Sequence, residues 1–220
     1  MSRKIHLIRH GATKGTQEKI LYGSTELPLT EEGRAEIART REEGLYPSAQ
    51  GALCFTSGMR RAEETFELIY GDTPREIMPD LREIDLGEFE MMCLEEATEH
   101  EIIRSWLSRE TDAFSFPGGD DHSGFRARTE RAAADLMERG LPQHDVEGAP
   151  ADPAKAPATN SAAGPEKDII AVCHGGVIIE IMDILLPHIK DDSWQWLPAP
   201  GYGYSIEVEG KTATGYTQIK

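Results

Sequence analysis

Short apolar runs that end at glycine or at polar residues recur along the chain. Residues 4–8 stop at the sequence RHG, residues 52–55 stop at TSG, and residues 168–173 stop at HGG. Runs of this kind are typical of buried strands that enter loops. We therefore expect a strand at each of these three positions.

Helical periodicity accompanies these strands. Thr30 is a suitable N-cap, with acidic residues directly after it, for a helix that runs to about Gly44. Apolar residues recur at helical spacing after the second strand on one face, and after the third strand on a wider face. Their positions are Met59, Ala62, Phe66 and Ile69 in the first case, and Val177, Ile178, Ile181, Met182, Leu185 and Leu186 in the second.

Repeated strand-to-helix units favour a largely parallel sheet with helices on both faces. Two more helices are expected between Thr98 and Arg139, separated by the sequence PGG at residues 117–119. Alternating apolar residues at 204–208, just before a glycine, predict an antiparallel edge hairpin. The predicted fold class is therefore α/β, a three-layer sandwich whose central sheet is mixed and mostly parallel.

One domain over residues 1–220 is expected, because 220 residues with 39% hydrophobic content supply a single full-sized core. Between residues 148 and 165, thirteen of eighteen residues are Ala, Pro or Gly, and no large apolar side chain offsets the entropy of ordering. We interpret this stretch, with its flanks at about 143–167, as a mobile surface insertion. A linker between domains is the alternative, but the remainder is too short to fold alone and carries a strand of the sheet.

The composition argues against several kinds of partner. With 23 basic and 39 acidic residues the net charge is −16, which repels the phosphate backbone of nucleic acids. No run approaches the ~20 apolar residues that a membrane span requires. The three cysteines lack CxxC spacing, and the N-terminus has no signal peptide, which suggests a reducing compartment. We expect a cytoplasmic protein that binds neither nucleic acid nor membrane.

Side chains suited to phosphate chemistry follow the predicted strands. A neutral imidazole such as His10, next to a guanidinium such as Arg9, can attack a phosphoryl group that the guanidinium holds. Arg60 and Arg61 open a predicted helix whose N-terminus favours an anion, so that one of them can complete a phosphate clamp. His174 precedes two glycines, which allow the backbone to approach a ligand. Because ligands collect at the carboxyl ends of strands in such sheets, this edge is the candidate site.

Each of these residues also has a purely structural interpretation. Arg9 and His10 can be a surface pair, the two later arginines can form ion pairs in a solvated helix turn, and His174 can cap a helix or lie in the core. Glu83, in the acidic segment 81–88, can donate a proton to a leaving alkoxide, but composition alone does not separate it from neighbouring carboxylates. Two arginines in one pocket repel a cation, so we expect no metal and no other cofactor.

Six sequence blocks resemble the histidine phosphatase superfamily, also called phosphoglycerate-mutase-like. They occur in the order of that family along nearly the whole chain, and only the Ala/Pro-rich stretch and the extreme C-terminus fall outside the resemblance. The blocks are LIRHGAT at 7–13, PLTEEG at 28–33, SGMRRA at 57–62, LREIDLG at 81–87, PGG at 117–119 and HGGV at 174–177.

The resemblance implies a role for each matching residue. His10 is implied as the nucleophile that becomes phosphohistidine, and Glu83 as the general acid and then the general base. The clamping arginines are implied to be Arg9 and Arg61, because Arg61 directly precedes the alanine of the motif. The other implied phosphate-binding residues are His174, which is also implied to be catalytic, Thr16 and Gly23. A covalent intermediate replaces one difficult hydrolysis by two easier steps.

Several positions depart from the family pattern. Ala12 stands where an acidic residue is often found, and Thr16 stands where asparagine is common. A threonine hydroxyl can replace part of the asparagine contact, so we expect altered affinity rather than lost activity. Gly58 replaces the usual proline, and Asp120 and Asp121 replace a Glu-Ser pair, which we interpret as changes nearer to substrate selection than to the phosphoryl pocket.

The resemblance predicts a metal-independent phosphomonoesterase whose partner is a small phosphorylated metabolite. Residues 21–30 and 116–119 look most like the small phosphatases, including the α-ribazole-5′-phosphate phosphatases. A cofactor-dependent phosphoglycerate mutase is the first alternative, although the chain is short for one. A phosphate-binding regulatory module without turnover is the second alternative, suggested by the substitutions at Ala12 and Thr16.

Overall fold

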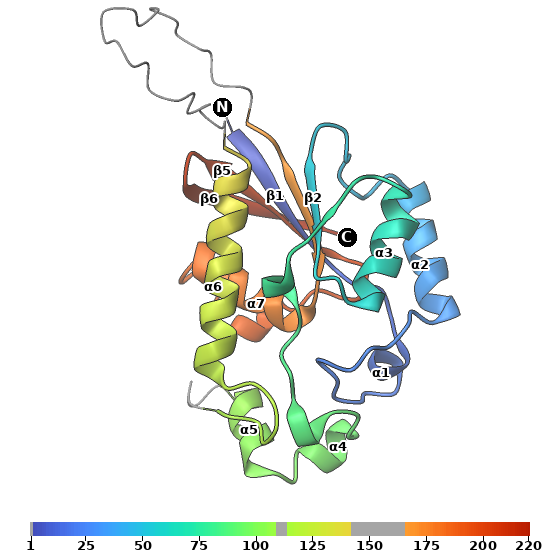
Figure 1. The fold of residues 1–220 in the computed structure, drawn as a ribbon, viewed down its shortest axis with the longest axis vertical. Helices are drawn as coiled ribbons and strands as arrows, with labels where there is room; N and C mark the ends of the chain where they lie inside the picture. Colours follow the sequence, from blue (N-terminus) through green and yellow to red (C-terminus); the bar gives the residue numbers. More distant parts are fainter. Residues whose placement is uncertain (1, 109–113, 142–165) are drawn as a thin grey trace, which may run out of the picture.

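The computed structural model describes residues 2–108, 114–141 and 166–220 (Figure 1). Its centre is a six-stranded sheet with the order β3-β2-β4-β1-β5-β6. Strands β1, β2, β3 and β4 run parallel to one another, whereas β5 and β6 form an antiparallel hairpin that pairs with β1. The mixed, mostly parallel sheet and the hairpin predicted from sequence are confirmed. The strands are β1 (Ser2–Arg9), β2 (Leu53–Thr56), β3 (Glu76–Ile77), β4 (Ile169–Cys173), β5 (Gly203–Glu209) and β6 (Thr212–Ile219).

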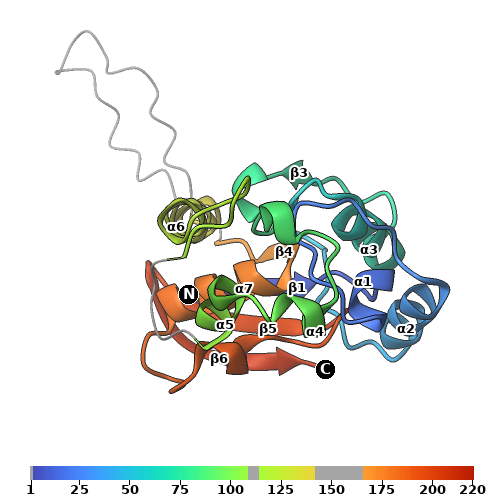
Figure 2. The ribbon, with the colours of Figure 1, turned by 90° about the horizontal axis from the view of Figure 1, so that it is seen from below.

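Helices cover both faces of this sheet (Figure 2). Helices α2 and α3 pack together on one side, and α6 and α7 pack together on the other. The α-helices are α1 (Lys14–Gln17), α2 (Glu31–Glu42), α3 (Arg60–Tyr70), α4 (Leu94–Ala97), α5 (Glu101–Ser108), α6 (His122–Arg139) and α7 (Gly175–Leu185). Short 3-10 turns are η1 (Pro79–Leu81), η2 (Gly87–Phe89) and η4 (Ser193–Trp196).

The central strands are buried on both faces because their apolar residues alternate between two cores. On β1, Leu7 joins the core beneath α6 and α7, and Ile8 joins the core beneath α2 and α3. On β4, Ala171 belongs to the first core and Val172 to the second. A strand that is apolar on both faces is typical of a parallel sheet between helix layers, so the predicted three-layer sandwich is confirmed.

The helix predicted from Thr30 forms as α2. The Thr30 side chain accepts a hydrogen bond from the Gly33 N–H, and Glu31 and Glu32 occupy the first turn, where negative charge is favourable. The two helices predicted between residues 98 and 139 form as α5 and α6. The short elements α1, α4 and β3, of two to four residues, were not predicted because they are too short to show a period.

The predicted insertion at about 143–167 lies outside the described residues except for Glu166 and Lys167. The Lys167 N–H donates to the Gly140 carbonyl at 2.9 Å, so the chain re-enters beside the end of α6 and continues into β4. No helix of the described residues has the length and apolar character that would cross a bilayer.

Candidate active site

The carboxyl ends of β1, β2 and β4 bring the sequence-predicted residues together. Strand β1 lies beside β4 in parallel, with Arg9 opposite Cys173. His10 and His174 each follow directly in sequence, and their ring centroids lie 5.2 Å apart. Strand β2 lies on the other side of β4 and leads through Ser57 into α3, whose first turn carries Arg61. The site therefore occupies the sheet edge that the strand pattern predicts.

His10 is a neutral imidazole, and its Nε2 has no hydrogen-bond partner in the part of the chain that the structure describes. Its side chain is 2% exposed, and its Nδ1 lies 2.8 Å from the Gly11 carbonyl oxygen. A carbonyl oxygen only accepts, so Nδ1 carries the proton and Nε2 carries the lone pair. Burial, and then the positive charges of Arg61 and Arg9, hold the pKa of His10 well below its usual range. The geometry thus provides a buried imidazole nitrogen that does not need to lose a proton at neutral pH before it can attack an electrophile.

This lowered pKa predicts the acid limb of the rate profile. An ordinary histidine is protonated, and therefore not nucleophilic, below pH 6.5, whereas His10 stays neutral there. We expect kcat/KM, corrected for the second ionisation of the substrate phosphate, to stay flat as the pH falls through 6.5 and to decline only at lower pH. An acid limb centred at pH 6.5 in the corrected profile would contradict this account of the His10 environment.

Arg61 and Arg60 are adjacent in sequence but lie in different environments. Arg61 is completely buried, and its Nη1 and Nη2 donate to the carbonyls of Thr25 and Gly23 at 2.9 and 2.7 Å. Burial lowers the pKa of Arg61, but a guanidinium keeps its charge in proteins. Arg60 is exposed and forms an ion pair with Glu64 at 2.7 Å. The solvated-turn interpretation therefore applies to Arg60 and not to Arg61.

Arg9 supplies a second guanidinium beside His10. Its Nη1 donates to the Pro198 carbonyl at 2.8 Å. Its Nε is buried and has no hydrogen-bond partner among the described residues. A buried donor without a partner is costly unless a ligand accepts from it, so Arg9 is prepared to hold an anion.

His174 is the N-cap residue of α7 and is completely buried. Its Nδ1 accepts from Arg61 Nε at 3.2 Å, which leaves Nε2 to donate to the Ser57 hydroxyl at 2.7 Å. Burial, followed by the nearby charge of Arg61, lowers the pKa of His174 well below its usual range. In this arrangement both ring nitrogens bond to protein groups, so His174 orients Arg61, and its direct contact with phosphate stays a prediction.

The Glu83 carboxylate contacts the N-terminus of α7. Its Oε2 accepts from the Gly176 N–H at 2.9 Å, and its Oε1 accepts from the Ile84 N–H at 3.0 Å. A Cβ at position 176 would lie 2.5 Å from Glu83 Oε1. The second glycine after His174 therefore leaves room for this carboxylate, which distinguishes Glu83 from the neighbouring acidic residues.

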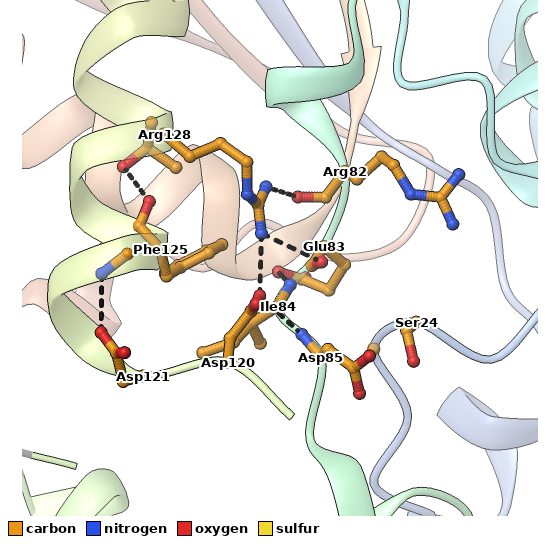
Figure 3. Close-up of polar contacts among 12 residues, drawn as sticks. Ser24, Arg82, Glu83, Ile84, Asp85, Asp120, Asp121, Phe125 and Arg128 are labelled. Atoms are coloured by element: carbon orange, nitrogen blue, oxygen red, sulfur yellow. Dashed lines mark hydrogen bonds and ion pairs between the residues drawn. The ribbon is translucent and has the colours of Figure 1, made fainter. Parts of the chain in front are cut away.

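Helix α6 contacts the loop that carries Glu83 through Arg128 (Figure 3). Arg128 donates to the carbonyl of Arg82, to the carbonyl of Glu83 at 3.4 Å and to the Asp120 carboxylate at 3.1 Å. Asp120 also accepts from the Asp85 N–H at 3.0 Å. Sequence reasoning missed Arg128, because no local pattern connects it to a loop 46 residues earlier.

These contacts bear on the departures from the family pattern. Asp120 is tied into the Glu83 loop, and Asp121 is the N-cap of α6, where it accepts from the Gly124 N–H at 2.8 Å. Both residues therefore have structural roles, and the interpretation that they lie nearer to substrate selection stays a prediction.

Thr16 and Gly23 bond to protein atoms. The Thr16 hydroxyl donates to the Thr13 carbonyl at 2.7 Å and accepts from the Thr13 N–H at 2.8 Å, which caps α1. Gly23 accepts from Arg61 through its carbonyl and donates its N–H to Glu90 at 3.0 Å. The predicted phosphate contacts of both residues stay predictions. Among the described residues, no three His, Cys, Asp or Glu side chains are grouped so as to hold a metal ion.

The architecture is that of the phosphoglycerate mutase-like α/β proteins. A phosphoglycerate mutase from Thermus thermophilus superposes with a TM-score of 0.65 and 27% identity, covering 97% of each chain. The α-ribazole phosphatase from Shigella flexneri superposes with a TM-score of 0.72 over 96% of this chain and 93% of its own; at 24% identity it shows the shared fold alone. The predicted fold class is confirmed.

The chain belongs to the histidine phosphatase superfamily, branch 1, whose sequence pattern matches residues 5–146. A probable 2-carboxy-D-arabinitol-1-phosphatase of Arabidopsis thaliana is 31% identical over 110 residues, which are 48% of this chain and 22% of that protein. A probable phosphoglycerate mutase, GpmB, of Salmonella paratyphi C is 29% identical over 143 residues, which are 64% of this chain and 65% of that protein. The matched region thus spans less than two thirds of either relative. The family predicted from the sequence blocks is confirmed, and it comprises phosphatases and mutases.

Proposed function

We propose that the protein is a metal-independent phosphomonoesterase that acts through a phosphohistidine at His10. One observation carries the proposal: His10 is buried, its Nδ1 bonds to the Gly11 carbonyl, and the positive charges of Arg61 and Arg9 act on it. Arg9 has a buried donor without a partner among the described residues, and Arg61 is fixed by the carbonyls of Gly23 and Thr25. A phosphoryl group held by both arginines presents its phosphorus to His10, and the guanidinium charges stabilise the equatorial oxygens in the transition state.

The reaction then proceeds in two balanced steps. His10 Nε2 attacks phosphorus, the bond to the ester oxygen breaks, and Glu83 in its protonated form gives the leaving alkoxide its proton. Glu83 next removes a proton from water, the water oxygen attacks phosphorus, and the bond to His10 breaks to release inorganic phosphate. The same carboxyl group serves as acid and then as base, which the contact of Glu83 with the α7 N-terminus supports by keeping it beside the site.

Replacement of Glu83 by glutamine is expected to lower kcat/KM, which reports the transfer of the phosphoryl group to His10, by about 10²- to 10⁴-fold for an alkyl phosphate. The loss should be much smaller for p-nitrophenyl phosphate, because p-nitrophenolate leaves without needing a proton. Steady-state kinetics on both esters test this, with Glu88→Gln on the exposed side of the same segment as the control. Equal losses of kcat/KM on the two esters would show that Glu83 is not the general acid.

We propose α-ribazole-5′-phosphate as the first natural ester to test, because residues 21–30 and 116–119 look most like the phosphatases that hydrolyse it. Phosphoglycerate mutase activity is the second candidate, favoured by the mutase among the relatives and by the mutase of the same fold. A small-molecule phosphomonoester is the partner that these residues suit, and a cytoplasmic location fits such a metabolite.

A panel of phosphomonoesters in excess EDTA tests the function. The panel contains p-nitrophenyl phosphate, 3-phosphoglycerate and α-ribazole-5′-phosphate, and the His10→Ala protein is assayed beside the unaltered one. We expect phosphate release that survives EDTA and is lost in the variant. Isomerisation of 3-phosphoglycerate with 2,3-bisphosphoglycerate, without release of phosphate, would assign the mutase reaction. No turnover of any ester would contradict the phosphatase and favour a phosphate-binding module.

A further inference from the structure

We propose that Glu90 is a positioning residue that aligns the phosphate clamp by holding the loop to which Arg61 is bonded. The inference rests on the proposed function, because it assigns a role at the same proposed phosphate site. It concerns the affinity of that site for phosphate, which can be measured whether or not the protein turns over an ester.

Glu90 is the hydrogen-bond acceptor for the loop at residues 23–25. Its half-buried carboxylate accepts from the backbone N–H of Gly23 at 3.0 Å, of Ser24 at 2.9 Å and of Thr25 at 3.2 Å. The Thr25 hydroxyl donates to it at 2.6 Å, and the Leu86 N–H donates at 3.0 Å. Three successive N–H groups that converge on one carboxylate fix the direction of the peptide units between them.

The same loop bonds to Arg61 through its other polar atoms. The carbonyls of Gly23 and Thr25 accept from Arg61 Nη2 and Nη1 at 2.7 and 2.9 Å, while their N–H groups donate to Glu90. The loop thus connects the Glu90 carboxylate to the Arg61 guanidinium. Gly23, which bonds to both, lies 67 residues before Glu90 in the sequence. If the carboxylate is removed, the N–H groups lose their acceptor and the two carbonyls are free to turn away from the guanidinium.

Close packing explains why the loop transmits this constraint. A Cβ at Gly23 would lie 1.7 Å from the Ile84 carbonyl oxygen and 3.2 Å from Glu90 Oε1. The loop therefore lies directly against the residue after Glu83, with no space for a side chain at position 23. Glu90 accepts hydrogen bonds from both sides of this contact: from Gly23 in the loop and from Leu86 in the segment that carries Glu83. It thereby aligns Arg61 relative to that segment.

The charge state of Glu90 agrees with this role. Burial alone would raise the pKa of Glu90, but the hydrogen bonds from the Thr25 hydroxyl and from the N–H groups of Leu86, Gly23 and Ser24 outweigh it and lower the pKa. The ionised form, which accepts from every one of these donors, is therefore the stable form at neutral pH.

A double-mutant cycle separates this role from a general contribution to folding. Glu90→Gln, Arg61→Ala and the double variant are titrated with inorganic phosphate by 31P NMR, and Glu88→Gln, an exposed neighbour, is the matched control. We expect Glu90→Gln to weaken phosphate binding about tenfold when Arg61 is present and less than about twofold when Arg61 is absent, because the effect passes through Arg61. Glu88→Gln should leave the affinity unchanged.

Thr25→Val gives a second test if Glu90→Gln does not fold. It removes one donor to the carboxylate and keeps the charge, and we expect about threefold weaker phosphate binding in the Arg61 protein only. Additive effects of the Glu90 and Arg61 substitutions, or unchanged phosphate affinity in folded Glu90→Gln, would overturn the inference. Coupled phosphate affinities in a protein that hydrolyses no ester would uphold the inference and refute the proposed function.

Discussion

Replacement of His10 by alanine is expected to lower kcat by about 10⁴- to 10⁶-fold, since the reaction loses its nucleophile. The fold should tolerate the change, because the Gly11 carbonyl of its own segment is the one hydrogen-bond partner of the His10 side chain among the described residues. Phosphate binding should persist, because both arginines and their carbonyl partners remain. Phosphate release from p-nitrophenyl phosphate in EDTA, together with a phosphate titration, measures the two effects separately.

A surface histidine provides the control for this substitution. His188 is exposed and has a left-handed backbone with φ of 65°, which asparagine tolerates better than alanine. His188→Asn should therefore keep full activity. A His10→Ala protein that keeps more than a tenth of the original kcat would show that another group attacks phosphorus.

Replacement of Arg61 by alanine is expected to lower kcat/KM by about 10²- to 10³-fold, the usual cost of one donor that stabilises the transition state. Arg60→Ala should change kcat/KM less than about twofold, since an exposed ion pair such as Arg60–Glu64 contributes little. Arg61→Lys should also lose much of the activity, because an ammonium group cannot bond to the Gly23 and Thr25 carbonyls and to phosphate in the geometry of a planar fork.

The same assay, with melting temperatures measured beside it, distinguishes the two arginines. Arg61 is buried, so Arg61→Ala is also expected to lower the melting temperature, while Arg61→Lys keeps the charge and most of the volume. Equal losses of kcat/KM in folded Arg60→Ala and Arg61→Ala would mean that the clamp has been assigned to the wrong residue.

The sequence predicted the part of the site that depends on strand ends. A strand followed by a polar residue can be predicted from the local sequence pattern. Parallel neighbouring strands place such residues at one edge of the sheet, and for this reason the ring centroids of His10 and His174 lie 5.2 Å apart. The choice between Arg60 and Arg61 was not readable from pattern alone, since both begin the same helix. The resemblance to the family implied Arg61. In the structure Arg61 is buried and Arg60 is exposed.

The residues that align the site could not be predicted in this way. Glu90 is one of 39 acidic residues, and its partners at 23–25 lie far away in sequence. Arg128 meets the Glu83 loop only because α6 packs against that segment. The roles of both residues arise from tertiary packing, which leaves no periodic signal in a single sequence. The hydrogen bonds of Thr16 and Gly23 to protein atoms also depend on such contacts.

The central claim is that the phosphoryl group passes through His10, and trapping the intermediate tests it most directly. The protein is mixed with a 32P-labelled phosphomonoester in EDTA and quenched within the first turnover under alkaline denaturing conditions. We predict a protein-bound phosphoryl group that is stable to alkali, labile to acid and located on His10, and that is absent from the His10→Ala protein. Rapid turnover without any labelled protein, or a label that survives in the His10→Ala protein, would contradict the account.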